Sequence, residues 1–192
     1  MIRLRIRGIR VDICFSFLLF NALIFLIREK QVILCFYGGC ILHELGHILA
    51  AAAVGIKMES VILSGAGIIM ETEKSAVCPI KNSLIVLLSG PAVNLAFAGI
   101  TALWGSSSLF TVLNLVLCMY NLLPFPGLDG GSAIEIIIGG SSWEYAARRV
   151  VTAVRYLMLF AALAALLHGI KEIFPAFAVL LCLNIINYIK KA

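Results

Sequence analysis

Charged side chains are scarce in this sequence. Only 13% of its 192 residues are Asp, Glu, Lys or Arg, whereas 62% are hydrophobic, and the mean hydropathy is +1.07. Soluble domains contain about 25% charged and 45–50% apolar residues, so the composition excludes an ordinary soluble protein. Apolar segments long enough to span a bilayer recur along the chain, and a cleaved secretory signal therefore does not account for them. The sequence predicts a membrane protein.

Several other features are missing. The six cysteines form no CxxC pair and lie mostly inside apolar runs, which excludes a disulfide framework. The net charge is +5, but no basic stripe alternates with aromatic residues, so nucleic acid is not an expected partner. Internal repeats and low-complexity tracts are also absent. We therefore expect residues 1–192 to form a single membrane-embedded domain.

Runs of about 20 apolar residues predict the membrane spans. The candidate segments are 11–28, 31–54, 83–103, 107–123, 150–168 and 173–189. The fourth segment is the least regular, because three serines and an asparagine shorten its apolar run. The expected fold class is an all-α polytopic membrane protein with about six transmembrane helices.

The distribution of positive charge predicts the orientation of these spans. With the N-terminus in the cytoplasm, 12 of the 15 Lys and Arg residues fall on the cytoplasmic side, and Arg28, Lys30 and Lys171 fall on the other side. Such an excess follows the positive-inside rule. We expect a multi-pass cell-membrane protein whose two termini and loops 55–82 and 124–149 are cytoplasmic.

Two segments outside the apolar runs do not have the pattern of a helix. Residues 2–7, IRLRIR, alternate apolar and basic side chains, as an amphipathic strand at a membrane surface would. Residues 60–73, SVILSGAGIIMETE, are two β-rich runs around Gly65 and Gly67 and predict a hairpin. A small cytoplasmic β-sheet is therefore expected; the alternative is an irregular surface loop.

The second apolar segment contains two histidines and a glutamate in the sequence HELGH, residues 43–47. Residues four apart on a helix differ by about 40° in direction, so His43 and His47 can bind one ion together. Glu44 points about 100° away from His43 and can act as a general base beside the ion. The alternative is that the histidines are hydrogen-bonded core residues. An ionisable residue at the bilayer centre costs about 2.5 to 3.5 kcal/mol on insertion scales, which favours the functional interpretation.

A third ligand is needed, and the chain contains only two aspartates. Asp12 lies at the cytoplasmic entrance of the first span, where an interfacial Asp needs no special role. Asp129 lies in YNLLPFPGLDGG, residues 120–131, where two prolines and a glycine break the helix. Irregular backbone at membrane depth is tolerated where it is buried or lines a cavity, so Asp129 is the candidate ligand. A simple helix-capping Asp is the alternative. His168 falls at the outer end of its span and is expected to be interfacial.

The motifs together resemble those of a known family. HELGH at 43–47, NLLPFPGLDG at 121–130 in the pattern NxxPxxxLDG, and SGPAVN at 89–94 are similar to the site-2 protease family (peptidase M50) of intramembrane zinc metalloproteases. Within it, the chain most resembles members like stage IV sporulation protein FB, over nearly its whole length.

This resemblance implies a zinc metalloendopeptidase that cuts a membrane-associated protein within or next to a transmembrane segment. It implies that His43, His47 and Asp129 hold one zinc ion, that Glu44 is catalytic, and that Asn94 and Asn121 line the site. The sporulation proteases carry a cytoplasmic CBS domain after the membrane core. No CBS or PDZ domain is recognisable in this sequence, so regulation through such a domain is not expected; membrane regulatory partners are conceivable.

Two further hypotheses come from the residues. A helical peptide bond must unwind before hydrolysis, and the hairpin with Gly65 and Gly67 could capture the extended substrate by strand addition. The competing function is a membrane metal-ion or proton transporter that uses the His, Glu and Asp side chains. A transporter would need polar groups along a path to both membrane faces, whereas here they are concentrated towards one side.

Overall fold

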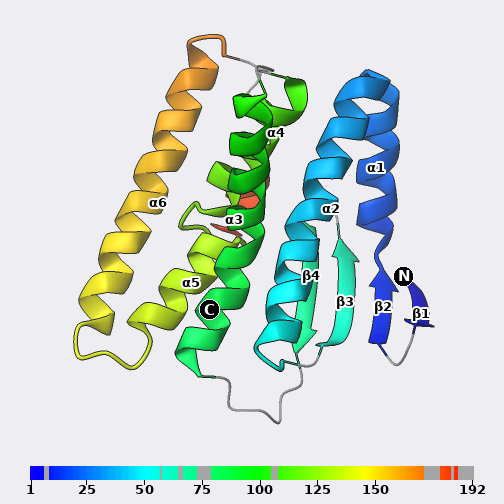
Figure 1. Cartoon of the computed structure of the whole chain (residues 1–192). Coiled ribbons are helices and arrows are strands. Elements are labelled where there is room, and N and C mark those ends of the chain that lie inside the picture. Colours follow the sequence, from blue (N-terminus) through cyan, green and yellow to red (C-terminus); the bar gives the residue numbers. More distant parts are fainter. Residues whose placement is uncertain are drawn as a thin grey trace. The chain divides into compact units, whose positions relative to one another are not determined.

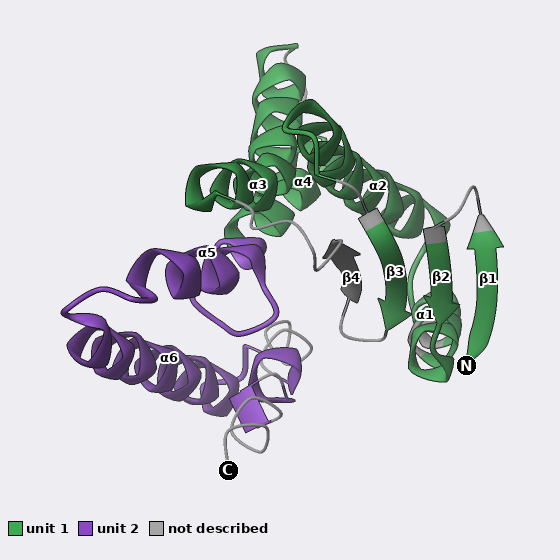
Figure 2. Ribbon diagram, turned by 90° about the horizontal axis from the view of Figure 1, so that it is seen from below, with its two compact units in different colours: residues 1–119 green, residues 120–192 purple. Residues whose placement is uncertain are grey.

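The structure is a computed structural model. It describes residues 1–6, 9–56, 58–64, 67–72, 79–104, 108–170, 178–182 and 184–185. The contacts within the chain define two compact units, residues 1–119 and residues 120–192, which are drawn in different colours in Figure 2.

The first unit contains a four-stranded sheet in the order β1-β2-β3-β4 (Figure 1). The strands are β1 (Ile2–Ile6), β2 (Ile9–Ile13), β3 (Met58–Ser64) and β4 (Gly67–Thr72). The pairs β1–β2 and β3–β4 are antiparallel hairpins, and β2 pairs with β3 in parallel. The strand predicted at residues 2–7 and the hairpin predicted at 60–73 are both confirmed.

Strand β2 corrects the predicted start of the first span. The segment predicted as helix from residue 11 continues the alternation of the first strand, with Val11 and Ile13 on one face and Arg10 and Asp12 on the other. The buried Asp12 carboxylate faces two cations, Arg3 at 3.8 Å and Arg10 at 3.5 Å. Arg3 is the cross-strand partner of Asp12, and such a pair of opposite charge favours the strand over a helix here.

Two helices connect β2 to β3. They are α1 (Phe15–Ile27) and α2 (Lys30–Ala53), and because only two residues separate them they form a helical hairpin (Figure 1). The hydroxyl of Tyr37 donates a hydrogen bond to Oδ1 of Asn21, and the Tyr37 ring stacks on Phe25 with centroids 6.0 Å apart. This mixed polar and aromatic contact fixes the two helices side by side.

Glycines bring three helices of the first unit close together. Helix α3 (Ile80–Leu103) approaches α2 so closely that a Cβ on Gly46 would lie 2.8 Å from the Ser89 carbonyl oxygen. A Cβ on Gly39 would lie 2.8 Å from the Leu117 side chain on α4 (Leu109–Asn121). Small residues at such contacts allow membrane helices to pack backbone against backbone.

The second unit contains α5 (Asp129–Ile138) and α6 (Glu144–Leu167). The sequence interpretation treated residues 124–149 as a loop, and that was wrong for α5 and for the first turns of α6. The two prolines and Gly127 break the chain only up to Leu128, after which the pattern SAIEIII restores an amphipathic helix. The chain before α5 packs into an apolar cluster formed by Phe125, Leu128, Leu159 and Leu180.

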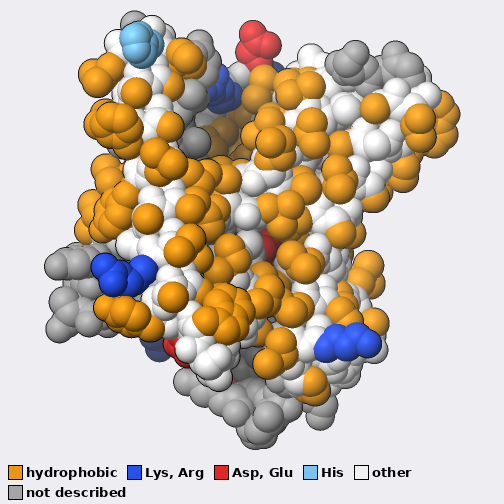
Figure 3. Space-filling view, turned by 90° about the vertical axis from the view of Figure 1, so that its left-hand side faces the viewer, with side chains coloured by type: hydrophobic (Ala, Val, Ile, Leu, Met, Phe, Trp, Pro, Cys, Tyr) orange, Lys and Arg blue, Asp and Glu red, His pale blue; other side chains and the backbone are white. Residues whose placement is uncertain are grey.

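Within the part of the chain that the structure describes, three helices are long and apolar enough to cross a membrane, namely α2, α3 and α6. Helices α1 and α4 are apolar but have 13 residues each, about 20 Å, which is shorter than the hydrocarbon core. Hydrophobic side chains cover most of the face drawn in Figure 3. The chain is a membrane protein, but the predicted number of six spans is not confirmed; most of the segment predicted at 173–189 lies outside the described residues.

Candidate metal centre

The two histidines of HELGH face each other on α2. His43 and His47 are 6% and 8% exposed, and their Nε2 atoms lie 3.1 Å apart. The rings are nearly perpendicular, with an interplanar angle of 81° and centroids 4.7 Å apart. The i, i+4 spacing on the helix therefore brings two buried imidazole nitrogens to one point, as the sequence predicts.

The protonation of His47 follows from its other ring nitrogen. Nδ1 of His47 lies 2.7 Å from the backbone carbonyl oxygen of Val86 on α3. A carbonyl oxygen only accepts hydrogen bonds, so Nδ1 carries the hydrogen and donates it. The neutral ring then keeps its lone pair on Nε2, where it is available to a cation.

Asn94 holds the other histidine. This fully buried residue of α3 has its side-chain nitrogen 3.3 Å from Nδ1 of His43, while its Oδ1 has no hydrogen-bond partner among the described residues. The oxygen and nitrogen ends of a side-chain amide have the same shape, so the orientation is chosen from the hydrogen bonds. With the amide turned round, Nδ1 of His43 donates to Oδ1 of Asn94, and this leaves Nε2 of His43 free of hydrogen. A metal-binding histidine usually donates its other ring N–H to an outer partner of this kind.

Gly90 closes the space beside the two imidazoles. A Cβ on this residue of α3 would lie 2.4 Å from Nε2 of His47 and 2.8 Å from Nε2 of His43. Only glycine is compatible with these contacts. The next residue, Pro91, lacks an N–H and loosens the helix where its backbone reaches the histidines.

These residues fit a metal ion. Two ligands at about 2.0–2.1 Å from a tetrahedral ion lie about 3.3 Å apart, close to the 3.1 Å between the two Nε2 atoms. Two buried lone pairs that face each other are stabilised by a cation between them, and each ring is oriented through Nδ1. The donor set of neutral imidazoles suits zinc and several other transition metals.

The other predicted site residues are distributed over both units. Glu44 is half-buried on α2, next to His43 in sequence. Asp129 is the first residue of α5 and Asn121 the last residue of α4; both are half-buried and belong to the second unit. Gly67 is the first residue of β4, whereas Gly65 lies outside the described residues.

The sequence analysis did not identify Gly90, Gly46 or the Val86 carbonyl as parts of the site. A backbone carbonyl has no signature in the sequence. The glycines could have been noticed, because glycine on a membrane helix marks a close approach of another element. The residues SGPAVN at 89–94 were singled out only for their similarity to a family.

The chain is similar in sequence to several known proteins. The chain is 34% identical over 116 residues to a protein of Synechocystis sp. whose name assigns it provisionally to the zinc metalloproteases. It is 28% identical over 124 residues to stage IV sporulation protein FB of Bacillus subtilis, and 28% identical over 153 residues to a zinc metalloprotease of Methanocaldococcus jannaschii. These matches cover 55%, 60% and 70% of the chain, respectively. They cover only 30%, 43% and 44% of the three relatives, so the chain spans less than half of their length. No family model matches the chain.

A solved structure gives the fold. The site-2 protease of Methanocaldococcus jannaschii matches the chain with a TM-score of 0.65 and 24% identity, over 94% of this chain and 92% of that one. The three sequence matches are similarities that do not depend on the fold. In fold the chain is similar to this site-2 protease, and in sequence it is similar to proteins named as zinc metalloproteases and to stage IV sporulation protein FB.

Proposed function

We propose that the protein is an intramembrane zinc metalloprotease that hydrolyses a peptide bond within or next to a transmembrane segment of a membrane-associated protein. The observation that carries this proposal is the buried His43–His47 pair with Glu44 beside it on an apolar helix. The relatives named as zinc metalloproteases support the same activity.

One zinc ion is held by His43, His47 and Asp129 in this proposal. Two neutral imidazoles and one carboxylate are a usual protein ligand set for catalytic zinc, and the carboxylate lowers the net charge of the buried centre. When bound, zinc acts as a Lewis acid on the substrate carbonyl and makes water acidic enough to attack at neutral pH. The pattern NxxPxxxLDG at 121–130 supports the choice of Asp129.

Glu44 moves the proton. Its carboxylate accepts a proton from the attacking water and then donates it to the nitrogen of the leaving amine. Replacement of Glu44 by glutamine removes the basic carboxylate but keeps the shape of the side chain.

The two asparagines have different proposed roles. Asn94 orients the imidazole of His43, which is supported by the 3.3 Å contact with Nδ1. Asn121 precedes the Pro-rich turn and supplies an amide donor for the oxyanion that develops during hydrolysis. Asn121 is the last residue of α4 and is half-buried.

The substrate is held in an extended conformation by the sheet. Strand β4 pairs only with β3 in the described sheet, so its outer edge is available for strand addition. Gly67 is the first residue of β4, and in this proposal it and Gly65, two residues earlier in the sequence, allow the close approach of another backbone. Strand addition keeps the peptide bond unwound and accessible.

The proposed localisation is the cell membrane, with several spans. The bias of positive charges supports cytoplasmic termini and a metal centre towards the cytoplasmic side. The substrate is then a membrane protein whose cleavable segment becomes accessible from that side.

The Glu44→Gln variant tests this function. Wild type and variant are co-expressed with candidate single-span substrates, fragments are identified by mass spectrometry, and bound metal is quantified. The variant should bind zinc and cleave nothing, whereas Glu29→Gln, an exposed carboxylate before the same helix, should cleave normally. A metal transporter would move zinc without cleaving any substrate. Unchanged proteolysis by Glu44→Gln would remove Glu44 from the mechanism.

A further inference from the structure

A buried arginine lies in the second unit, far along the sequence from the histidines. Arg155 is in the interior of α6 and only 4% exposed, in a helix whose mean hydropathy is high enough for a membrane span. A cation in such a helix is costly, and it is retained where it has a partner and a task. The proposed catalytic chemistry does not use Arg155.

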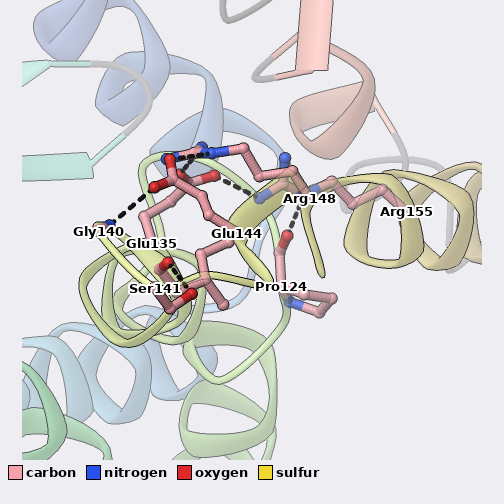
Figure 4. Close-up of polar contacts among 8 residues, drawn as sticks. Pro124, Glu135, Gly140, Ser141, Glu144, Arg148 and Arg155 are labelled. Atoms are coloured by element: carbon pink, nitrogen blue, oxygen red, sulfur yellow. Dashed lines mark hydrogen bonds and ion pairs between the residues drawn. The ribbon is translucent and has the colours of Figure 1, made fainter. Parts of the chain in front are cut away.

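The partners of Arg155 lie on both sides of Asp129 in the sequence (Figure 4). Its Nε donates a hydrogen bond to the backbone carbonyl of Pro124, in the turn that leads to Asp129. Its Nη2 lies 3.5 Å from Oε1 of Glu135, two turns into α5. The guanidinium therefore connects the residues before the proposed zinc ligand to the helix that begins with it.

The same face of α6 also packs on this turn. Leu159, one helical turn after Arg155, joins the fully buried Phe125 and the buried Leu128 in one apolar cluster. Helix α6 therefore holds the turn by two contacts. One is polar, at Pro124, and the other is apolar, at Phe125 and Leu128.

The turn itself has little freedom to adjust. A Cβ on Gly130 would lie 2.2 Å from the Leu122 carbonyl oxygen, and a Cβ on Gly131 would lie 1.9 Å from the Phe125 carbonyl oxygen. The N–H of Leu128 donates to the Phe125 carbonyl at 3.2 Å. The first turn of α5 is packed directly on the preceding backbone, so a shift at Pro124 is transmitted to Asp129.

Glu135 is shared with a second arginine. Arg148 forms a short contact with Oε2 of Glu135, and its Nε donates to Oε1 of Glu144 at 2.9 Å. Oε2 of Glu144 accepts a hydrogen bond from the N–H of Gly140 at 2.7 Å. Glu135 therefore retains a cationic partner without Arg155, and the contact specific to Arg155 is the one with the Pro124 carbonyl.

We propose that Arg155 is a positioning residue that fixes the 124–128 turn and thereby the direction of the Asp129 carboxylate for metal binding. This inference rests on the proposed function, since it assigns Asp129 to the metal. The planar fork of Arg reaches the carbonyl and the carboxylate together; the single ammonium of Lys does not reproduce both contacts. Partners that orient metal ligands typically affect metal affinity 10–100-fold.

The experiment compares four purified, detergent-solubilised proteins: wild type, Arg155→Lys, Arg155→Met, and Arg155→Met combined with Glu135→Leu. Zinc affinity is measured by competition with a chelator, and hydrogen exchange of residues 122–131 is measured without metal. Arg149→Met, on the same helix but exposed and stacked on Tyr145, is the matched control.

Arg155→Met should weaken zinc binding about 10–100-fold and accelerate exchange in the turn by on the order of 10-fold. The double variant also removes the Glu135 carboxylate, which in Arg155→Met is neutralised by Arg148 alone, but it should not restore affinity. Full restoration would mean that Arg155 only neutralises Glu135, and would overturn the inference.

Where Arg155→Met does not fold, the same outcomes are read from Arg155→Lys. If wild type binds no zinc while the exchange still accelerates, the proposed function fails and the role in fixing the turn stands. If wild type binds zinc and the Arg155 variants change neither quantity, this inference alone fails.

Discussion

Replacing Gly90 with alanine should exclude the metal from the histidine pair. The added Cβ would lie 2.4 Å from Nε2 of His47, 2.7 Å from its Cε1, and 2.8 Å from Nε2 of His43. Non-bonded heavy atoms settle at about 3.5–4.0 Å, so the His47 ring must recede by about 1 Å. Metal–ligand distances tolerate only about 0.2 Å. Both imidazoles therefore leave the geometry that a zinc ion needs.

The expected loss of zinc affinity is at least the 10–100-fold seen when an outer partner is removed, because here the ligands themselves are displaced. The metal-free protein should lose only about 1–3 kcal/mol of stability through overpacking. Zinc affinity is measured by chelator competition, and thermal unfolding of the metal-free protein is followed in the same detergent.

Gly99→Ala is the matched control, since it lies on the same helix and a Cβ there would meet nothing within 4 Å. It should bind zinc like wild type and unfold at the same temperature or slightly higher, because alanine favours a helix over glycine. Wild-type zinc affinity in Gly90→Ala would refute the assignment of the metal to the space between the two Nε2 atoms.

Three further predictions concern the same unit. Gly46→Ala should separate α2 from α3, because its Cβ would lie 2.8 Å from a backbone oxygen of α3, and a lower thermal unfolding temperature would show this. Asn94→Ala should free the His43 ring and weaken zinc binding about 10–100-fold, measured by chelator competition; unchanged affinity would show that the amide does not orient the ligand. Proline at both Gly65 and Gly67 should abolish cleavage while zinc remains bound, and intact cleavage in a fragment assay would exclude substrate capture by the β4 edge.

The parts of the fold that sequence could predict are those with a simple period. HELGH identified the paired imidazoles, since spacing on one helix suffices to bring His43 and His47 together. The alternation in residues 2–7 identified a strand for the same reason, and two β-rich runs around glycines identified the hairpin at 60–73. Ile9–Ile13 has the same alternation, but its last three residues join the apolar run that follows, so the predicted first span begins at residue 11.

The parts that sequence did not predict depend on contacts between elements. Helix α5 follows two prolines and a glycine, so its ten residues appeared to continue a loop. Gly90 acquires its importance only because α3 places its backbone against the histidine rings. In the sequence Arg155 is one of many charges expected on the cytoplasmic side; its burial, its ion pair with Glu135 and its hydrogen bond to Pro124 distinguish it from the exposed Arg149.

Cleavage by the purified protein tests the central claim most directly. The chain is reconstituted in lipid vesicles with a single-span substrate, and the products are identified by mass spectrometry before and after removal of metal by a chelator. The protease account predicts a cut within or beside the span that stops on chelation, returns when zinc is added, and is absent in Glu44→Gln at every zinc concentration. Cleavage that persists in the metal-free protein or in Glu44→Gln would contradict a zinc-dependent mechanism with Glu44 as its base.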